Sequence, residues 1–132
     1  MINSLIFLLC LALCSCSSYK YGEVESEYVL EGDATDVLPT VERWLKGYRG
    51  KIESVSEDEI KANIAIDNGS VGYLCDVTIQ IDNGKVNIKT GVKDIVMPHN
   101  LVITDEEAVI KSTKIEVMKL IHEPLLSKIN QK

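Results

Sequence analysis

Three cysteines lie close together near the start of the sequence: Cys10, Cys14 and Cys16. Thiols at this spacing could form a disulfide, bind a metal, or serve as an attachment point for a covalent modification. A metal site is disfavoured, because no His or carboxylate lies nearby to complete a ligand set. The fourth cysteine, Cys75, is distant in the sequence. The role of the first three therefore depends on the apolar segment that contains them.

That segment runs from Leu5 to Cys14 and is about ten residues long. A secretory signal needs an apolar core of roughly 7–15 residues, whereas a membrane-spanning helix needs roughly 20. The segment therefore predicts a signal peptide, although no Lys or Arg precedes Lys20. Its end, Leu13-Cys14-Ser15-Cys16, resembles the lipobox of bacterial lipoproteins. In a lipobox, an apolar residue at −3 and a small residue at −1 precede the cysteine that is diacylated.

The lipobox resemblance implies that residues 1–15 are removed and that Cys16 is the lipidated first residue of the mature chain. Two acyl chains give stable membrane attachment, so we expect the protein in the bacterial cell envelope. Ser17 is not the Asp that suggests inner-membrane retention in some bacteria, which favours the outer membrane. Cys75 is then left without an intrachain disulfide partner. The alternative is an ordinary secreted or cytosolic start whose cysteines are apolar core residues.

Other residues with reactive side chains do not combine into a known site. His99 and His122 match no common metal-ligand spacing, and we expect His122 near a helix end, where the helix dipole favours it. Cys75 is centred in an alternating apolar segment, which is typical of a small core residue rather than a nucleophile. We therefore expect no catalytic residues, no metal and no cofactor.

The chain has a net charge of −6, which repels nucleic acid and excludes it from the expected partners. The part that follows the signal has the size of one domain. We interpret residues 16–25, which are mostly polar, as a tether that has no need to fold. Residues 26–132 are then a single α+β domain.

Hydrophobic periodicity predicts the elements of that domain. A strand over 26–30 precedes a helix that Thr35 or Asp36 caps and that Gly50 ends. A meander follows, with strands at 51–55, 60–67, 71–81 and 85–92 and a short last strand at 92–97. Gly91 is a candidate bulge. Tight turns are predicted at Asn68-Gly69 and Asn83-Gly84. The final helix starts at a capping box, Thr104-Asp105-Glu106-Glu107, and Pro124 should kink or interrupt it.

The strands of the meander alternate between apolar and polar residues, so the predicted sheet has one face for helices and one for solvent. The polar positions form a candidate partner-facing surface: Asn63, Thr78, Gln80, Asn87 and Lys89. We expect an envelope protein or a glycan as its partner. A solvated sheet surface with no partner is the alternative.

This order of elements resembles the TBP-like-fold domain of unknown function found in bacterial lipoproteins. Trp44-Leu45 matches the central pair of that family's first helix, and residues 77–95 match its central hairpin, with Asp82-Asn83-Gly84 at the turn. The resemblance implies one curved antiparallel sheet of about five strands with two helices packed on one face, in the order β-α-β-β-β-β-α. It implies no activity.

The sequence thus predicts a lipid-anchored envelope protein that is a non-enzymatic binding or structural module. The alternative is a small-ligand carrier or an enzyme with a pocket between sheet and helices. A cytosolic regulator is a third reading if the leader is misassigned.

Overall fold

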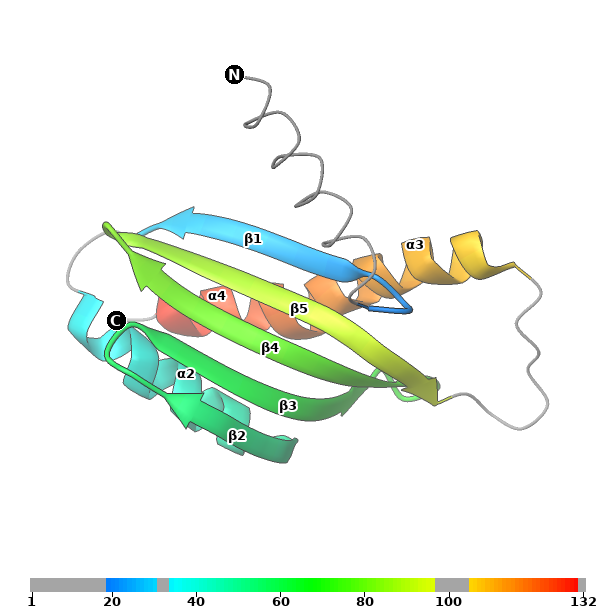
Figure 1. Cartoon of the computed structure of the whole chain (residues 1–132), viewed down its shortest axis with the longest axis horizontal. Coiled ribbons are helices and arrows are strands. Elements are labelled where there is room, and N and C mark those ends of the chain that lie inside the picture. Colours follow the sequence, from blue (N-terminus) through cyan, green and yellow to red (C-terminus); the bar gives the residue numbers. More distant parts are fainter. Residues whose placement is uncertain (1–18, 31–33, 97–104, 131–132) are drawn as a thin grey trace, which may run out of the picture.

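The structure of the protein is a computed structural model that describes residues 19–30, 34–96 and 105–130. Within them, one five-stranded antiparallel sheet is covered on one face by helices, as predicted (Figure 1). The strands are β1 (Glu23–Val29), β2 (Arg49–Val55), β3 (Glu59–Asp67), β4 (Gly72–Asp82) and β5 (Lys85–Val96). The helical elements are a short 3-10 turn η1 (Ala34–Asp36), α2 (Val37–Lys46), α3 (Glu106–Val117), a π-helical turn η2 (Met118–His122) and α4 (Glu123–Ile129).

The strand order in the sheet is β1-β5-β4-β3-β2. Strands β2 to β5 form a meander. Strand β1 pairs with β5, so β1 and β2, which α2 connects in the chain, lie at opposite edges of the sheet. Helix α2 packs against β2 and β3, and α3 packs against β1. Because α3, η2 and α4 follow one another without a break, they form a single long C-terminal helix behind the sheet (Figure 1).

The two predicted Asn-Gly turns are confirmed. Asn83 has φ 49° and Gly84 has φ 73° between β4 and β5, the two positive values that a type I′ hairpin turn requires. At the β3–β4 turn, the Asn68 side-chain oxygen accepts from the backbone N–H groups of Ser70 and Val71 at 2.9 and 2.8 Å. Local side-chain chemistry therefore fixes where these strands reverse.

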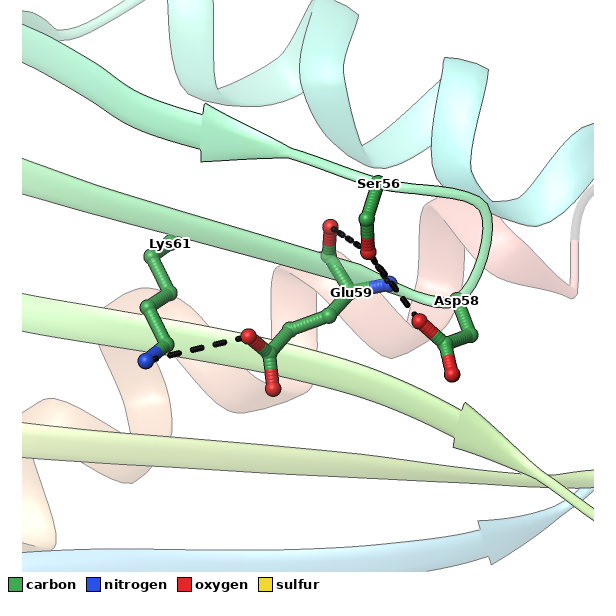
Figure 2. A network of polar contacts seen from close by, with 4 residues as sticks. All are labelled: Ser56, Asp58, Glu59 and Lys61. Carbon is green, nitrogen blue, oxygen red and sulfur yellow. Dashed lines mark hydrogen bonds and ion pairs between the residues drawn. The ribbon is translucent and has the colours of Figure 1, made fainter.

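The acidic turn between β2 and β3 is held by Ser56 (Figure 2). Its hydroxyl accepts from the Glu59 N–H at 3.1 Å and lies 3.0 Å from the Asp58 carboxylate, to which it donates. Glu59 in turn lies 3.8 Å from the Lys61 ammonium. The Asp58 carbonyl also accepts from the N–H of Ile81 on β4 at 2.8 Å, so the turn is tied to the centre of the sheet.

Helix α2 ends earlier than predicted. Lys46 is its last residue and Gly47 is its C-cap, whereas the sequence pattern indicated Gly50. Gly50 lies instead in β2 with φ 150°, where a Cβ would overlap the backbone of Asn63. At the start, the Asp36 side chain makes no capping hydrogen bond, and the Thr40 hydroxyl donates to the Asp36 carbonyl at 2.7 Å.

The C-terminal helix starts at Asp105, whose carboxylate accepts from the Ala108 N–H at 3.2 Å. Asp105 is therefore the N-cap, and Thr104 of the predicted capping box lies outside the described residues. The predicted interruption at Pro124 takes the form of the π-helical turn η2, in which the Glu123 N–H donates to the Met118 carbonyl. Proline has no N–H to continue the α-helical ladder, and the wider turn precedes it.

The first strand begins at Glu23 rather than Ser26, so the prediction of an unfolded tether up to residue 25 is wrong at its C-terminal end. Residues 19–22 form a turn closed by the Gly22 N–H and the Tyr19 carbonyl, 3.3 Å apart. The Gly22 carbonyl then accepts from the Val92 N–H at 3.0 Å. Glu23 and Glu25, which follow, resemble a linker in sequence because they are charged residues of an edge strand.

Strand β5 is continuous from Lys85 to Val96, where two strands were predicted, and Met97 lies outside the described residues. Leu74 pairs with Asp94 while Cys75 pairs with Val92, so Lys93 is the extra residue of the irregularity and Gly91 is not the bulge. A bulge adds one unpaired residue without ending a strand, which explains the single long strand.

The core lies between the inner face of the sheet and the helices. Its fully buried side chains come from every layer: Val41, Ile60, Val77, Ile79, Val86, Ile88, Val117, Ile121 and Leu125. The inward positions predicted for β3 and β4 are confirmed as buried, except that Ile81 is half-buried. Each such side chain stabilises the fold by about 1.5–3 kcal/mol, so the helix-facing side of the sheet is sealed by apolar packing.

Candidate functional site: the open face of the sheet

The face of the sheet opposite the helices is covered by no helix or strand among the described residues. All five predicted surface residues lie on it, because they alternate with buried neighbours along their strands. Thr78 pairs with Lys89 and Gln80 pairs with Asn87 across β4 and β5. Asn63 lies one strand further, opposite Asp76. The structure therefore brings the five residues to one surface, which we call the open face.

Opposite charges are paired across the open face. Lys89 lies 3.2 Å from Glu23, Lys85 lies 3.2 Å from Glu27, and Lys93 lies 3.2 Å from Asp76. The Asn87 amide also donates to Glu25 at 2.8 Å. Exposed pairs of this kind contribute about 0–1 kcal/mol each. Their main consequence is that Lys85, Lys89 and Lys93 are balanced by carboxylates, whereas Arg49 and Lys51 at the β2 edge form no ion pair within the described residues.

A polar cavity of about 250 Å³ opens at the end of the open face, beside the β4–β5 hairpin. It contains two of the predicted residues, and its lining is Glu27, Gln80, Asp82, Asn83, Lys85 and Asn87. Amides, carboxylates and an ammonium group together offer both donors and acceptors. This chemistry suits a ligand rich in hydroxyl or peptide groups.

A second hollow of about 340 Å³ lies toward β2, with Asn63, Ala65 and Leu74 in its lining. Leu74 is 40 % exposed, which makes this the apolar part of the open face. The Asn63 amide nitrogen donates to Glu53, whereas its side-chain oxygen is buried without a hydrogen-bond partner among the described residues. A buried acceptor without a partner is unfavourable unless a ligand or water satisfies it.

Tyr19, which the sequence assigned to a tether, lies over Gly91 on the open face. Its ring lies where a Cβ on Gly91 would be, so any other residue at position 91 would have to displace the ring. The phenol donates to the Asp76 carboxylate at 3.2 Å, and burial together with the Asp76 charge raises the pKa of the Tyr19 phenol. Sequence reasoning missed this contact; a glycine within a strand was its only signal.

His122 forms a hydrogen-bonded cluster with Ser26 and Thr90 that the sequence did not predict. It is fully buried, not at an exposed helix end. Its Nδ1 lies 2.8 Å from Ser26 Oγ on β1 and its Nε2 lies 2.9 Å from Thr90 Oγ1 on β5. Burial lowers the pKa of His122 to about 4, so the ring is neutral at pH 7. The π-helical turn places both Ile121 and His122 on the buried side.

A neutral imidazole beside a serine hydroxyl is the pair that activates nucleophilic serines. Here, none of the cavities described above is lined by Ser26 or His122. The Ser26 hydroxyl is further enclosed by Met118, whose sulfur lies 3.4 Å away. The cluster therefore joins β1, β5 and the C-terminal helix through hydrogen bonds. Within it the His122 ring is fully buried, whereas Ser26 is half-buried.

The comparisons with known proteins concern the fold. The scan against protein-family models and the search of curated proteins each found no match. A solved structure does match: a TBP-like protein from Parabacteroides distasonis, with a TM-score of 0.61 and 10 % sequence identity. The alignment covers 83 % of this chain and 94 % of that chain. The fold is TBP-like. At this identity the likeness extends to the fold alone.

The remaining predicted residues are placed as follows within the TBP-like domain. Cys75 is buried and free, and burial raises the pKa of its thiol to about 12, as expected of a core residue. Cys16 and His99 lie outside the described residues. Within residues 19–30, 34–96 and 105–130, no group of three His, Cys, Asp or Glu side chains could hold a metal ion. In the same ranges no helix combines the length and apolarity needed to cross a bilayer.

Proposed function

We propose that this protein is a lipid-anchored module of the bacterial cell envelope that binds a partner protein or glycan through its open face and catalyses no reaction. One observation carries the proposal: one side of the TBP-like sheet is sealed by helices, and the other is uncovered and polar. The cavity beside the β4–β5 hairpin, with Gln80 and Asn87 in its lining, is the contact region that the side-chain chemistry favours.

The anchor in this proposal is Cys16. Tyr19 is already packed on the sheet, so only Ser17 and Ser18 separate the lipidated residue from the folded domain. Three residues of extended chain span about 10 Å, which holds the Tyr19 end of the sheet close to the bilayer. From Gly91 to Lys85, β5 rises about 20 Å. The β4–β5 hairpin lies at the opposite end of the sheet from the start of β1 (Figure 1). In this proposal the polar cavity beside that hairpin is therefore directed away from the bilayer.

The charge pattern argues against nucleic acid as the partner. DNA binding by a curved sheet requires unpaired basic residues and apolar wedges. On the open face, Lys85, Lys89 and Lys93 are each paired with a carboxylate. Arg49 and Lys51 at the β2 edge are the exceptions, and the chain as a whole carries a net charge of −6. A protein or glycan surface with its own donors and acceptors is the better match.

The proposed location in the outer membrane rests on Ser17, which is not the Asp that suggests inner-membrane retention in some bacteria.

The anchor is tested by expressing the full chain with its leader and measuring the intact mass of the protein from detergent-solubilised envelopes. We expect a chain that starts at Cys16 and carries acyl mass, and we expect Cys16→Ser to abolish both. A polypeptide that retains Met1 without acyl mass would refute the anchor.

Partner binding is tested by affinity capture from the same envelopes. An Asn87→Arg variant places a bulky cation in the polar cavity, whereas Lys111→Glu changes an exposed residue of α3 on the other side of the molecule. We expect one partner to be recovered with the wild type and with Lys111→Glu and to be lost with Asn87→Arg. Equal recovery with all three would remove the open face from the proposal.

The alternative function is an enzyme or ligand carrier that uses the space between sheet and helices. Its specific support is the 2.8 Å approach of Ser26 Oγ to His122 Nδ1. A fluorophosphonate probe labels activated serines, so it tests the enzyme form of this alternative. Labelling of the wild type that disappears in Ser26→Ala would establish the alternative, and we expect no labelling.

A further inference from the structure

A groove of about 640 Å³ runs between α2 and α4, on the helical side of the molecule and away from the open face. Its lining comes from both helices and from the residues that follow α2: Thr40, Arg43, Trp44, Gly47, Tyr48 and Lys128. The volume is within the range of about 300–1,000 Å³ typical of small-molecule sites. No carboxylate is among these lining residues.

Two aromatic rings form one wall of the groove. Trp44 and Tyr48 lie with ring centroids 4.7 Å apart and planes inclined by 54°. Both pack partly against the core, yet each remains half-buried rather than enclosed. Gly47 lies between them in sequence and adds no side chain. The face of an aromatic ring is negatively polarised and attracts C–H groups, so this wall suits the C–H face of a sugar ring.

Two cations reach the groove from different helices. Arg43 on α2 and Lys128 on α4 are exposed, and neither forms an ion pair within the described residues. Lys46, one turn along α2, differs because it lies 3.4 Å from Glu42. In a chain with a net charge of −6, two unpaired cations beside one groove favour an anionic ligand, and the guanidinium group can bind a carboxylate through two parallel hydrogen bonds.

We propose that this groove binds an anionic saccharide, whose ring packs on Trp44 and Tyr48 and whose carboxylate is bound by Arg43 and Lys128. Hydroxyl groups on Thr40 and Tyr48 supply further hydrogen-bonding atoms for the hydroxyls of the sugar. The site is separate from the open face. It requires neither lipidation nor a partner on the open face, so it goes beyond the proposed function.

Trp44 is the only tryptophan of the chain, so intrinsic fluorescence reports on the groove directly. The full chain in detergent is titrated with trigalacturonate, with the neutral maltotriose as the matched saccharide and inorganic phosphate as the matched anion. We expect a saturable emission change with trigalacturonate and at least about tenfold weaker binding of the other two. Arg43→Gln and Lys128→Gln should each weaken trigalacturonate binding about tenfold, while Lys46→Gln should not.

Each other outcome overturns the proposal. Equal responses to trigalacturonate and maltotriose would show a neutral glycan site, and equal competition by phosphate would show an anion site without saccharide recognition. If Lys46→Gln weakens trigalacturonate binding as much as Arg43→Gln does, the ligand is attracted by the overall positive charge of α2 rather than bound in the groove. No response to trigalacturonate at millimolar concentration would show that the groove is not a site. Thermal unfolding of each variant verifies that it is folded.

Discussion

Acidification should destabilise this protein through a single buried side chain, His122. Its ring lies against Ser26 and Thr90 in the core, and the loss of hydration lowers its pKa to about 4 from an ordinary value of 6.5. In the unfolded chain the ring binds a proton below about pH 6.5, whereas in the folded chain it stays neutral down to about pH 4. The unfolded state therefore binds more protons in this window, and stability falls as the pH falls.

The size of the effect follows from the two pKa values. Each unit of difference is worth about 1.4 kcal/mol, and most of the window between 6.5 and 4 is crossed on going from pH 7 to pH 5. We expect a loss of about 2 kcal/mol in the free energy of unfolding over that step. For a domain of this size the loss corresponds to a decrease of roughly 8 °C in the melting temperature.

Urea unfolding of the wild type and of His122→Gln at both pH values measures this loss. Glutamine does not titrate. Subtracting the pH-dependent loss of His122→Gln from that of the wild type therefore removes the contribution of the carboxylates, which both chains share. The chain has only one other histidine, His99, and His99→Gln should retain the full pH dependence. If glutamine prevents folding, an NMR titration of the wild-type imidazole signals gives the folded pKa directly. Equal losses in wild type and His122→Gln, or a folded pKa near 6.5, would refute the reasoning.

Three further predictions concern contacts that the sequence does not reveal. Gly91→Ala should cost about 1–3 kcal/mol by displacing the Tyr19 ring, and much less in a Tyr19→Ala background; additive costs would show that the two residues do not interact. Thr90→Val should cost about 1–3 kcal/mol, because it leaves a ring nitrogen of His122 without a partner, and an unchanged urea midpoint would contradict this. Cys75, with a thiol pKa of about 12, should react with a disulfide reagent at pH 8 only after unfolding; rapid reaction of the folded chain would contradict its burial.

The meander was predictable because its determinants are local. Val77 and Ile79 alternate with Thr78 and Gln80, and a period of two specifies a strand with one buried face without reference to any partner. The Asn83-Gly84 turn adopts the positive φ values that its residue types permit. The same local rules placed the open-face residues on one surface, since alternation alone decides on which side of the sheet a residue lies.

The start of the fold was not predictable in the same way. Glu23 and Glu25 resemble a solvated linker in sequence, and they belong to β1 because this segment pairs antiparallel with β5. The Asn87 amide of β5 also donates to Glu25. Glu25 and Asn87 are 62 positions apart in the sequence, and nothing near Glu25 indicates that partner. Tertiary pairing decided the structure of this segment where local composition indicated none.

The sequence evidence for a buried His122 lies in the strands that face it and not in the helix that contains it. Ser26 and Thr90 occupy inward positions of β1 and β5. Their paired neighbours on that face of the sheet are apolar: Ile88 opposite Ser26, and Val24 and Val77 opposite Thr90. Two inward hydroxyls require a polar partner, because burying an unpaired hydroxyl costs about 1–3 kcal/mol. A histidine on the covering helix meets that requirement. The position of Pro124 indicated an interruption there, but the rotation that turns His122 inward comes from the π-helical turn itself.

The same packing weighs against the enzyme alternative. For a substrate to reach the fully buried His122 ring beside Ser26, the C-terminal helix would have to leave the sheet and expose Val117, Ile121 and Leu125, all fully buried. At about 1.5–3 kcal/mol for each side chain, that opening costs roughly 5–9 kcal/mol. A whole domain is stable by only about 5–15 kcal/mol, so an open form is nearly as rare as the unfolded chain. A reaction in which substrate contacts the His122 ring would have to proceed from that population, whereas binding on the open face requires no rearrangement of the core.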